Sequence, residues 1–273
     1  MVTTLVAARV SRSPGIAPGR VGAVVNRNVG ALRSGASYWL VLFSGFFEPV
    51  FYLFSIGIGV GKLVGDISLI DGQILPYATF VAPAMLATSA MNGAMAETTF
   101  NFFFKFKYAK TYDAILATPV RPFEIALGEL VWAMMRGSVY TAVFLGVMVV
   151  MKLTTMGWAL AAFPATMLVG FAFGAIGMVF TTLMRGWQDF DLMNTAQFAL
   201  FLFSATFAPI QSYPAVFQVL IQLTPLYHAV EMVRDLTTGH PDLATAGHAL
   251  YLMVMMAVGL LLTGRRLEKM LLK

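Results

Sequence analysis

The sequence predicts an all-α integral membrane protein with six transmembrane helices. Three observations predict this fold: the composition, six long apolar stretches, and the distribution of positive charge. Hydrophobic residues make up 59% of the 273 residues, charged residues make up 11%, and the mean hydropathy is +0.78. So few polar side chains cannot coat a water-soluble globule of this size, so we expect a bilayer to act as the solvent. Cysteine is absent, which excludes disulfides and cysteine-based metal sites.

Each apolar stretch approaches or exceeds the roughly 20 residues that a helix needs to cross the hydrocarbon core. The expected spans are Tyr38–Gly61, Leu75–Ala96, Ile125–Met151, Gly157–Met184, Leu192–Phe207 and Thr245–Gly264. The segment 208–228 is apolar but too short to cross alone, and its prolines would break a helix. We expect it to form an external hairpin, re-entrant or interfacial, that contains Pro209, Pro214, Pro225 and Tyr227.

Positive charge predicts the orientation. Of the 18 basic residues, fourteen fall on the side of the two termini, three fall on the other side, and Arg136 lies within the third span. The positive-inside rule therefore places both termini in the cytoplasm of a multi-pass inner (plasma) membrane protein. The predicted organisation is a cytoplasmic arm at 1–37, a six-span domain at 38–264 and a cytoplasmic tail at 265–273.

The arm contains a candidate interfacial helix. Val21, Val25, Val29 and Leu32 share one helical stripe, and basic residues occupy the other faces. This pattern favours a basic amphipathic helix on the membrane surface, and a plain solvated leader is the alternative. The net charge of +5 does not indicate nucleic-acid binding, because the basic residues flank apolar spans.

The loop at 98–124 is expected to carry a short cytoplasmic helix. Pro119 ends that helix, and Pro122 with Glu124 suits the first turn of the next. Ile115 and Leu116 would be exposed on it unless other helices cover them. An apolar knob of this kind is a docking surface for a partner, and the alternative is that the loop packs on its own membrane helices.

Three charged residues fall within predicted spans, where each costs about 2.5 to 3.5 kcal/mol at the helix centre. Glu129 and Arg136 are two turns apart on one helix face, with Trp132 between them, so we expect them to meet directly or through water. They form either a polar patch on a translocation surface or a structural ion pair. Glu48 precedes Pro49, where a kink favours an orientation toward a subunit interface or cavity.

Motifs for chemistry within this chain are missing. The glycines before Lys62 do not form a phosphate-binding loop, because Ile56 and Leu63 occupy positions that require Gly and Ser or Thr. Gly57 with Gly61, and Gly170 with Gly174, instead suit close helix packing. His228, His240 and His248 lack metal-ligand spacing. Asp189 and Asp191 are the only close acidic pair that an enzyme within the membrane could use, and a solvated turn explains them equally well.

Two segments and the order of elements carry a resemblance to a known family. In residues 111–129 an acidic residue and apolar residues precede Thr-Pro-Val, and a Glu and a Gly follow. In residues 207–228 prolines recur and a Pro-x-Tyr closes the segment. The chain resembles permease subunits of the ABC type-2 transporter family, nearest to the NodJ and DrrB/DrrC-like export permeases. It departs from many members in having Ser-Tyr-Pro at 212–214 where they have Leu-Pro.

The resemblance implies an ATP-driven exporter in which two permease chains, identical or paralogous, each receive a separate ABC ATPase subunit. This chain is then not an enzyme and binds no cofactor, since ATP and Mg²⁺ belong to the partner ATPase. The implied coupling residues are Tyr112, Asp113, Ile115, Leu116, Thr118 and Pro119. The expected cargo is amphipathic or lipid-like: a drug, a glycolipid or a lipooligosaccharide.

The cost of hydrating an acyl chain also favours a route in which such cargo enters an apolar groove sideways from the bilayer. Moving a 14-carbon chain through water would cost about 11 kcal/mol at about 0.8 kcal/mol per CH₂. Phe46, Phe47, Phe51 and Met85 would suit an adaptable apolar groove, although lipid-facing positions explain them as well. The alternative function is an ion-coupled secondary carrier or channel that works without an ATPase, suggested by the charges within the spans.

Overall fold

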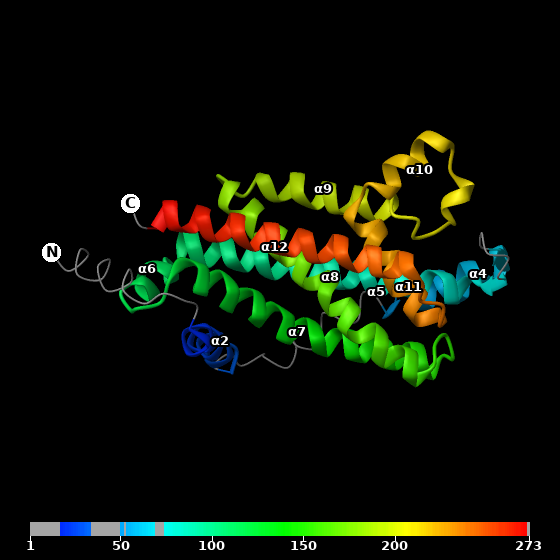
Figure 1. Ribbon diagram of the computed structural model, residues 1–273, viewed down its shortest axis with the longest axis horizontal. Coiled ribbons are helices and arrows are strands. Elements are labelled where there is room, and N and C mark those ends of the chain that lie inside the picture. The colour runs from blue at the N-terminus through cyan, green and yellow to red at the C-terminus, as the bar shows by residue number, and fades with distance from the viewer. Residues whose placement is uncertain (1–16, 34–49, 52, 69–73, 272–273) are drawn as a thin grey trace.

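The computed structural model describes residues 17–33, 50–51, 53–68 and 74–271, which form an elongated helical bundle (Figure 1). The predicted all-α class is confirmed. The helices are α2 (Pro18–Arg33), α4 (Gly61–Val64), α5 (Tyr77–Ala96), α6 (Thr111–Leu116), α7 (Pro122–Val150), α8 (Met156–Leu183), α9 (Asp189–Leu202), α10 (Ala215–Gln222), α11 (Pro225–Thr238) and α12 (Leu243–Leu271).

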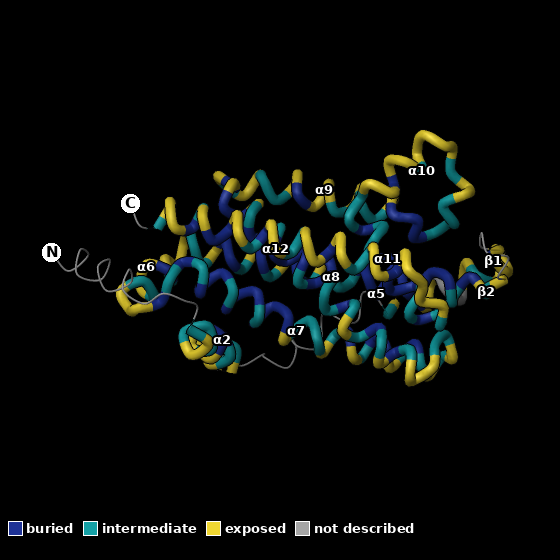
Figure 2. The backbone as a smooth tube through the Cα atoms, in the orientation of Figure 1, coloured by how far each residue is buried: buried dark blue, intermediate teal, exposed yellow. Residues whose placement is uncertain are grey.

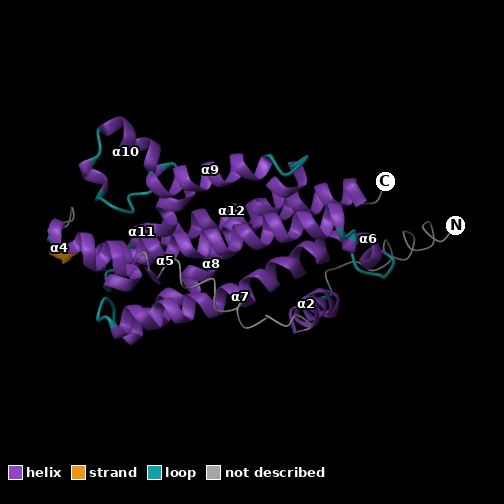
Figure 3. Ribbon diagram, turned by 180° about the vertical axis from the view of Figure 1, so that it is seen from behind, coloured by secondary structure: helices purple, strands orange, loops and turns teal. Residues whose placement is uncertain are grey.

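Shorter elements complete the described chain (Figure 3). π-helical turns occupy Leu53–Val60 (η1), Glu97–Asn101 (η2) and Phe104–Tyr108 (η3), and a 3₁₀ turn occupies Ile210–Ser212 (η4). Strands β1 (Asp66–Ser68) and β2 (Ile74–Pro76) pair antiparallel in one small hairpin, with Ile67 opposite Leu75. Because η2 and η3 follow α5 almost directly, they carry this helix on toward α6.

Three of the described helices are long and apolar enough to cross a membrane: α7, α8 and α12. The pair α10 and α11, bent by 84°, adds a fourth if both belong to one broken span. Helices α5 and α9 occupy the places of the second and fifth predicted spans. Helix α9 has 14 residues and is about 21 Å long, short of the roughly 30 Å hydrocarbon core. Most of the first predicted span lies outside the described residues, so the count of six remains a prediction.

The two ends of the bundle differ. Helix α6 and the C-terminal end of α12 lie at one end, which we call the α6 end, whereas α4 and α10 lie at the other, the α10 end (Figure 1). Helix α2 lies across the long helices near the α6 end, as expected of an interfacial helix. The elements that the sequence assigns to the cytoplasm are therefore gathered on one side.

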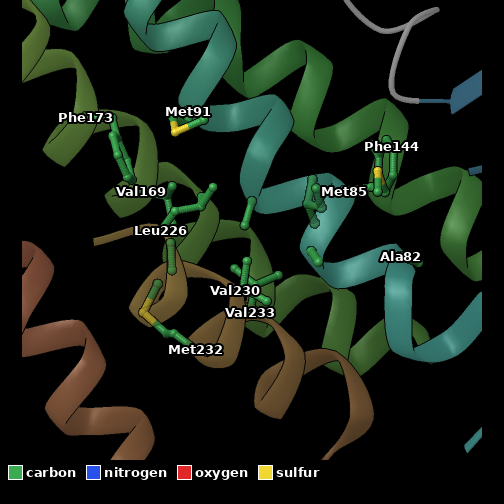
Figure 4. Close-up of a cluster of buried hydrophobic side chains, with 14 of the residues drawn as sticks. Ala82, Met85, Met91, Phe144, Val169, Phe173, Leu226, Val230, Met232 and Val233 are labelled. Atoms are coloured by element: carbon green, nitrogen blue, oxygen red, sulfur yellow. The ribbon is translucent and has the colours of Figure 1, made fainter. Parts of the chain in front are cut away.

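The main core lies where α5, α8 and α11 pack together (Figure 4). Phe173 and Val230 lie in it with Met85, which is 3% exposed and so belongs to the core rather than to an open groove. Buried residues follow the interior of the bundle, and exposed residues follow the outer faces of α9 and α12 (Figure 2). An apolar outer face of this kind suits a bilayer.

Small residues let the central helices approach closely. A Cβ on Gly174 would lie 2.6 Å from Leu130 Cδ1, and a Cβ on Gly170 would lie 2.7 Å from Met134 Sδ. A Cβ on Gly259 would lie 2.9 Å from the carbonyl carbon of Ala175. The packing role predicted for Gly170 and Gly174 is consistent with this geometry.

A buried arginine fastens the irregular segment after α9. Arg234 is 4% exposed, although the sequence pattern assigned it to the external loops. Its Nη2 donates to the Ala205 carbonyl at 2.9 Å and its Nε donates to the Phe80 carbonyl at 3.3 Å. The guanidinium also lies 4.0 Å from the Phe80 ring centroid and pairs with Glu231. The bond to Ala205 satisfies a backbone carbonyl at the break between α9 and α10, and the bond to Phe80 fixes the same guanidinium to α5.

Candidate functional site

A buried polar cluster joins four elements at the α6 end. We call it the Glu129 cluster; it comprises Asn28 of α2, Lys105 of η3, Tyr112 of α6 and Glu129 of α7. Glu129 Oε2 accepts from Lys105 Nζ at 2.6 Å and from Asn28 Nδ2 at 3.0 Å, and Lys105 Nζ also donates to Asn28 Oδ1 at 3.0 Å. Glu129 is only 5% exposed. A carboxylate this buried depends on its partners for stability.

Tyr112 brings the short helix α6 into this cluster. It is 1% exposed and packs against Phe102, with ring centroids 5.0 Å apart. Burial first, and the charge of Glu129 second, raise the pKa of the Tyr112 hydroxyl well above its ordinary value. Within the described part of the chain, neither this hydroxyl nor Glu129 Oε1 reaches a partner at hydrogen-bond geometry. These two oxygen atoms belong to side chains that lie next to each other in the cluster.

A second contact fixes α2 against the first turn of α7. Glu124 is fully buried, and its Oε1 accepts from the Ala17 N–H at 3.0 Å and from Arg20 Nη1 at 3.5 Å. Its Oε2 accepts from the Arg121 N–H at 2.9 Å, which closes the start of α7 as expected for Glu124 after Pro122. One oxygen of this carboxylate therefore binds the start of α2, and the other oxygen caps α7.

Close packing reinforces these polar contacts. A Cβ on Gly128 would lie 2.7 Å from Val24 Cβ, so α2 and α7 touch through a glycine. The buried residues of α2 are Val24, Val25 and Asn28. Of the predicted stripe, Val25 is buried and Val21, Val29 and Leu32 are half-buried, and Val24 and Asn28, which the pattern did not include, are buried beside it.

Apart from Tyr112, which is buried, the predicted coupling residues divide into two groups. Asp113, Thr118 and Pro119 are exposed, whereas Ile115 and Leu116 are half-buried against a cluster that includes Leu267 of α12. The expected apolar knob is thus partly covered by helices of the same chain. The exposed surface of α6 and of the turn after it combines Asp113 and Thr118 with small apolar residues.

Glu129 and Arg136 do not pair with each other, contrary to the expectation from their spacing. Arg136 Nη1 pairs with Glu97 of η2, and its Nη2 donates to the Tyr140 hydroxyl at 3.3 Å. The neighbouring segment after α5 supplies a separate partner to each charge, Lys105 to Glu129 and Glu97 to Arg136. Trp132 is buried between them on α7, and Glu48 lies outside the described residues.

The prolines of the predicted hairpin begin its helical turns. Pro209 precedes η4, Pro214 precedes α10, and Pro225 is the first residue of α11. Thr224 Oγ1 accepts from the Tyr227 N–H at 3.3 Å and caps α11. Whether this segment re-enters the membrane remains a prediction, with the 84° bend between α10 and α11 consistent with it.

The structure also brings together two histidines that the sequence left apart. His228 Nδ1 and His248 Nδ1 are 2.7 Å apart, and the Tyr251 ring stacks on His228 with centroids 4.0 Å apart. In the described residues no third ligand joins them in a metal-binding group. The pair joins α11 to α12 near the α10 end.

The long apolar helices α7, α8 and α12 are those of a membrane-embedded protein. Residues 25–237 match the family described as ABC-2 type transporter, so the chain belongs to this family. It is 32% identical over 228 residues to Nodulation protein J of Rhizobium leguminosarum bv. trifolii, which covers 83% of this chain and 85% of that protein.

A second relative gives the same result. Nodulation protein J of Sinorhizobium fredii (strain NBRC 101917 / NGR234) is 36% identical over 208 residues, covering 74% of this chain and 75% of that protein. The predicted resemblance to ABC type-2 export permeases is therefore confirmed. The chain is a membrane-embedded permease of an ABC exporter, from a family of membrane subunits that carry no ATPase domain of their own and generally work with ATPase subunits.

Proposed function

We propose that this permease moves an amphipathic or lipid-like molecule out of the cytoplasm or the inner leaflet, driven by a separate ATPase that docks on α6. The Glu129 cluster carries this proposal, because it places Tyr112 of α6 beside the carboxylate that joins α7 to α2. Lys105 Nζ and Asn28 Nδ2 both bind Glu129 Oε2, and Tyr112 of α6 lies buried beside the same carboxylate.

In this mechanism the exposed side chains of α6 and of the turn after it contact the ATPase. Asp113 offers a charge, and Thr118 and Pro119 offer an adjacent surface. Tyr112 lies on the opposite, buried side of α6. When the ATPases close around ATP and Mg²⁺, displacement of α6 pushes Tyr112 against the start of α7 and moves α2 with it. No cofactor is needed within the permease.

The proposed assembly contains two permease chains and two ATPase subunits in the inner membrane, with both termini in the cytoplasm. The gathering of α2, α6 and the end of α12 on one side supports this orientation. An amphipathic cargo is favoured because an apolar route in or beside the bilayer avoids the cost of moving acyl chains through water. The relatives are named for nodulation, and we propose no particular cargo from that name.

The test is ATP hydrolysis by the ATPase that co-purifies with the full chain in lipid nanodiscs. Asp113→Ala with Thr118→Ala is expected to lower permease-stimulated hydrolysis at least fivefold, with unchanged membrane insertion and melting temperature. Asp191→Ala is the matched control, because Asp191 is also an exposed acid, in the first turn of α9. Unchanged stimulation in the double variant would contradict the coupling role of α6.

The same preparation tests the alternative of a carrier that needs no ATPase. That function predicts transport into liposomes by the permease alone under a proton or sodium gradient. The intramembrane charges that suggested it are paired where they are described, Glu129 with Lys105 and Arg136 with Glu97. Gradient-driven transport without ATP would overturn the proposal.

A further inference from the structure

A large apolar cavity lies between α9 and the body of the bundle. Its volume is about 710 Å³, within the range of about 300 to 1,000 Å³ typical of ligand sites. Sixteen residues from α5, α8, α9, α11, α12 and the turn before α9 line it, and all but Arg185, Asp189 and Gln197 are apolar. Met91, Met193 and Met255 contribute flexible walls from three different helices. Helix α9 buries only Met193, so it forms one wall of the cavity and does not pack tightly against the other helices.

The shape of the cavity restricts its occupant. Along α9 it runs from Asp189 to Leu200, about 16 Å at 1.5 Å per residue. A space of about 710 Å³ over that length is elongated and lined almost entirely by apolar side chains. An extended hydrocarbon chain suits a space of this shape and chemistry.

The α6 end of the cavity carries a positive charge. Arg185 is exposed there, and its guanidinium makes no hydrogen bond to another described residue. Asp189 uses its Oδ2 for backbone groups, accepting from the Arg185 N–H at 2.6 Å and from the Gly186 N–H at 3.2 Å. The carboxylate therefore caps the turn before α9, and the guanidinium donors remain available to a ligand.

Aromatic residues place this charge at the depth of lipid headgroups. Trp187 lies 5.5 Å from Tyr108 and 5.8 Å from Phe103 between ring centroids, and it is 46% exposed. Phe190 and Phe103 are 5.3 Å apart in the same group. Exposed Trp and Tyr side chains gather where hydrocarbon meets headgroups, so Arg185, two residues before Trp187, lies at that level.

We propose that this cavity holds an acyl chain of an anionic membrane lipid whose phosphate binds Arg185. The site lies within one chain, between its own helices. It is a binding site for a resident lipid and does not depend on which molecule the exporter carries. The positive charge of Arg185 at one end and the elongated apolar interior together favour this occupant.

Photolabelling of the full chain in nanodiscs tests the proposal. The probe is phosphatidylglycerol with a diazirine in the middle of one acyl chain, added to phosphatidylcholine nanodiscs. In the unaltered protein, labelling of peptides that contain Met91, Met193 or Met255 should saturate at a low fraction of probe. Labelling at Leu261 and Leu262, on the exposed face of α12, should rise in proportion to the probe. Proportional labelling at both places would overturn the proposal.

Two matched pairs of variants locate the site. Ala196 lines the cavity, whereas Ala199 is exposed on the same helix and does not line it. Ala196→Phe should lower cavity labelling at least fivefold, and Ala199→Phe should leave it unchanged. Arg185→Gln should lower the preference for phosphatidylglycerol over phosphatidylcholine at least threefold, and Arg265→Gln should not. Equal cavity labelling by both lipids, or an unchanged signal in Ala196→Phe, would contradict the assignment.

Discussion

Asn28 Nδ2 donates to Glu129 Oε2 at 3.0 Å, and this bond joins the crosswise helix α2 to the long helix α7. The two residues are 101 positions apart in the sequence. Lys105 binds the same oxygen, and Tyr112 of α6 lies beside the carboxylate. Tyr112 therefore packs beside the group that joins α7 to α2, which is the contact that the proposed coupling role of α6 needs.

Asn28→Ala should loosen α2 from the bundle. The change removes a buried hydrogen bond to a charged group, which costs about 1 to 3 kcal/mol. Hydrogen exchange of the α2 backbone amides should become faster, while exchange in α8 stays the same. Asn26→Ala is the control, because Asn26 is exposed on the same helix. Equal exchange in the two variants would show that the Asn28 bond does not hold α2.

Lys105→Met should destabilise the protein strongly, because it leaves Glu129 buried beside one remaining donor. Breaking a buried ion pair on one side costs about 3 to 5 kcal/mol. Lys107→Met, at an exposed neighbouring position, should have little effect on thermal unfolding in detergent. Adding Glu129→Gln to Lys105→Met should recover part of the loss, since it removes the unpaired charge. A double variant no more stable than Lys105→Met alone would contradict the pairing.

Tyr112→Phe should leave stability unchanged or raise it slightly, because the Tyr112 hydroxyl is buried without a hydrogen-bond partner in the described structure. Tyr112→Ala should cost about 3 to 5 kcal/mol, since it creates a cavity beside Phe102. Thermal unfolding of both variants separates the two contributions. A loss of more than about 1 kcal/mol in Tyr112→Phe would instead indicate that the hydroxyl is hydrogen-bonded.

Arg234→Met should open the segment between α9 and α10. It removes donors to the carbonyls of Ala205 and Phe80, and the longest-range of these contacts joins residues 154 positions apart. Limited proteolysis should then cut near 203–214 at least several times faster. Arg234→Lys should be cut faster in the same way, because an ammonium group cannot donate to both carbonyls with the geometry of a guanidinium. Protection equal to the unaltered protein in Arg234→Met would contradict this role.

The long helices and the boundaries of the coupling loop follow directly from local sequence. Apolar length predicts α7, α8 and α12, and the prolines at 119 and 122 bracket the end of α6 and the start of α7. These features depend on neighbouring residues alone. The family resemblance rests on the same local segments.

The partners of the buried charges could not be predicted in the same way. A two-turn spacing brings Glu129 and Arg136 to one face of α7, yet the extension of α5 supplies Lys105 to one and Glu97 to the other. The covering of Ile115 and Leu116 likewise depends on Leu267, near the end of α12. Each of these contacts joins distant segments, so it is set by packing rather than by sequence periodicity.

The most direct test of the coupling role of α6 is a cross-link from its exposed face. The chain has no cysteine, so Asp113→Cys provides a unique attachment point for a benzophenone maleimide in membranes. We expect irradiation to join this position to a chain that carries a G-x-x-x-x-G-K-[ST] sequence, and ATP to change the yield. Failure to form that cross-link, with labelling instead by a membrane-impermeant maleimide from outside the cell, would contradict both the orientation and the coupling mechanism.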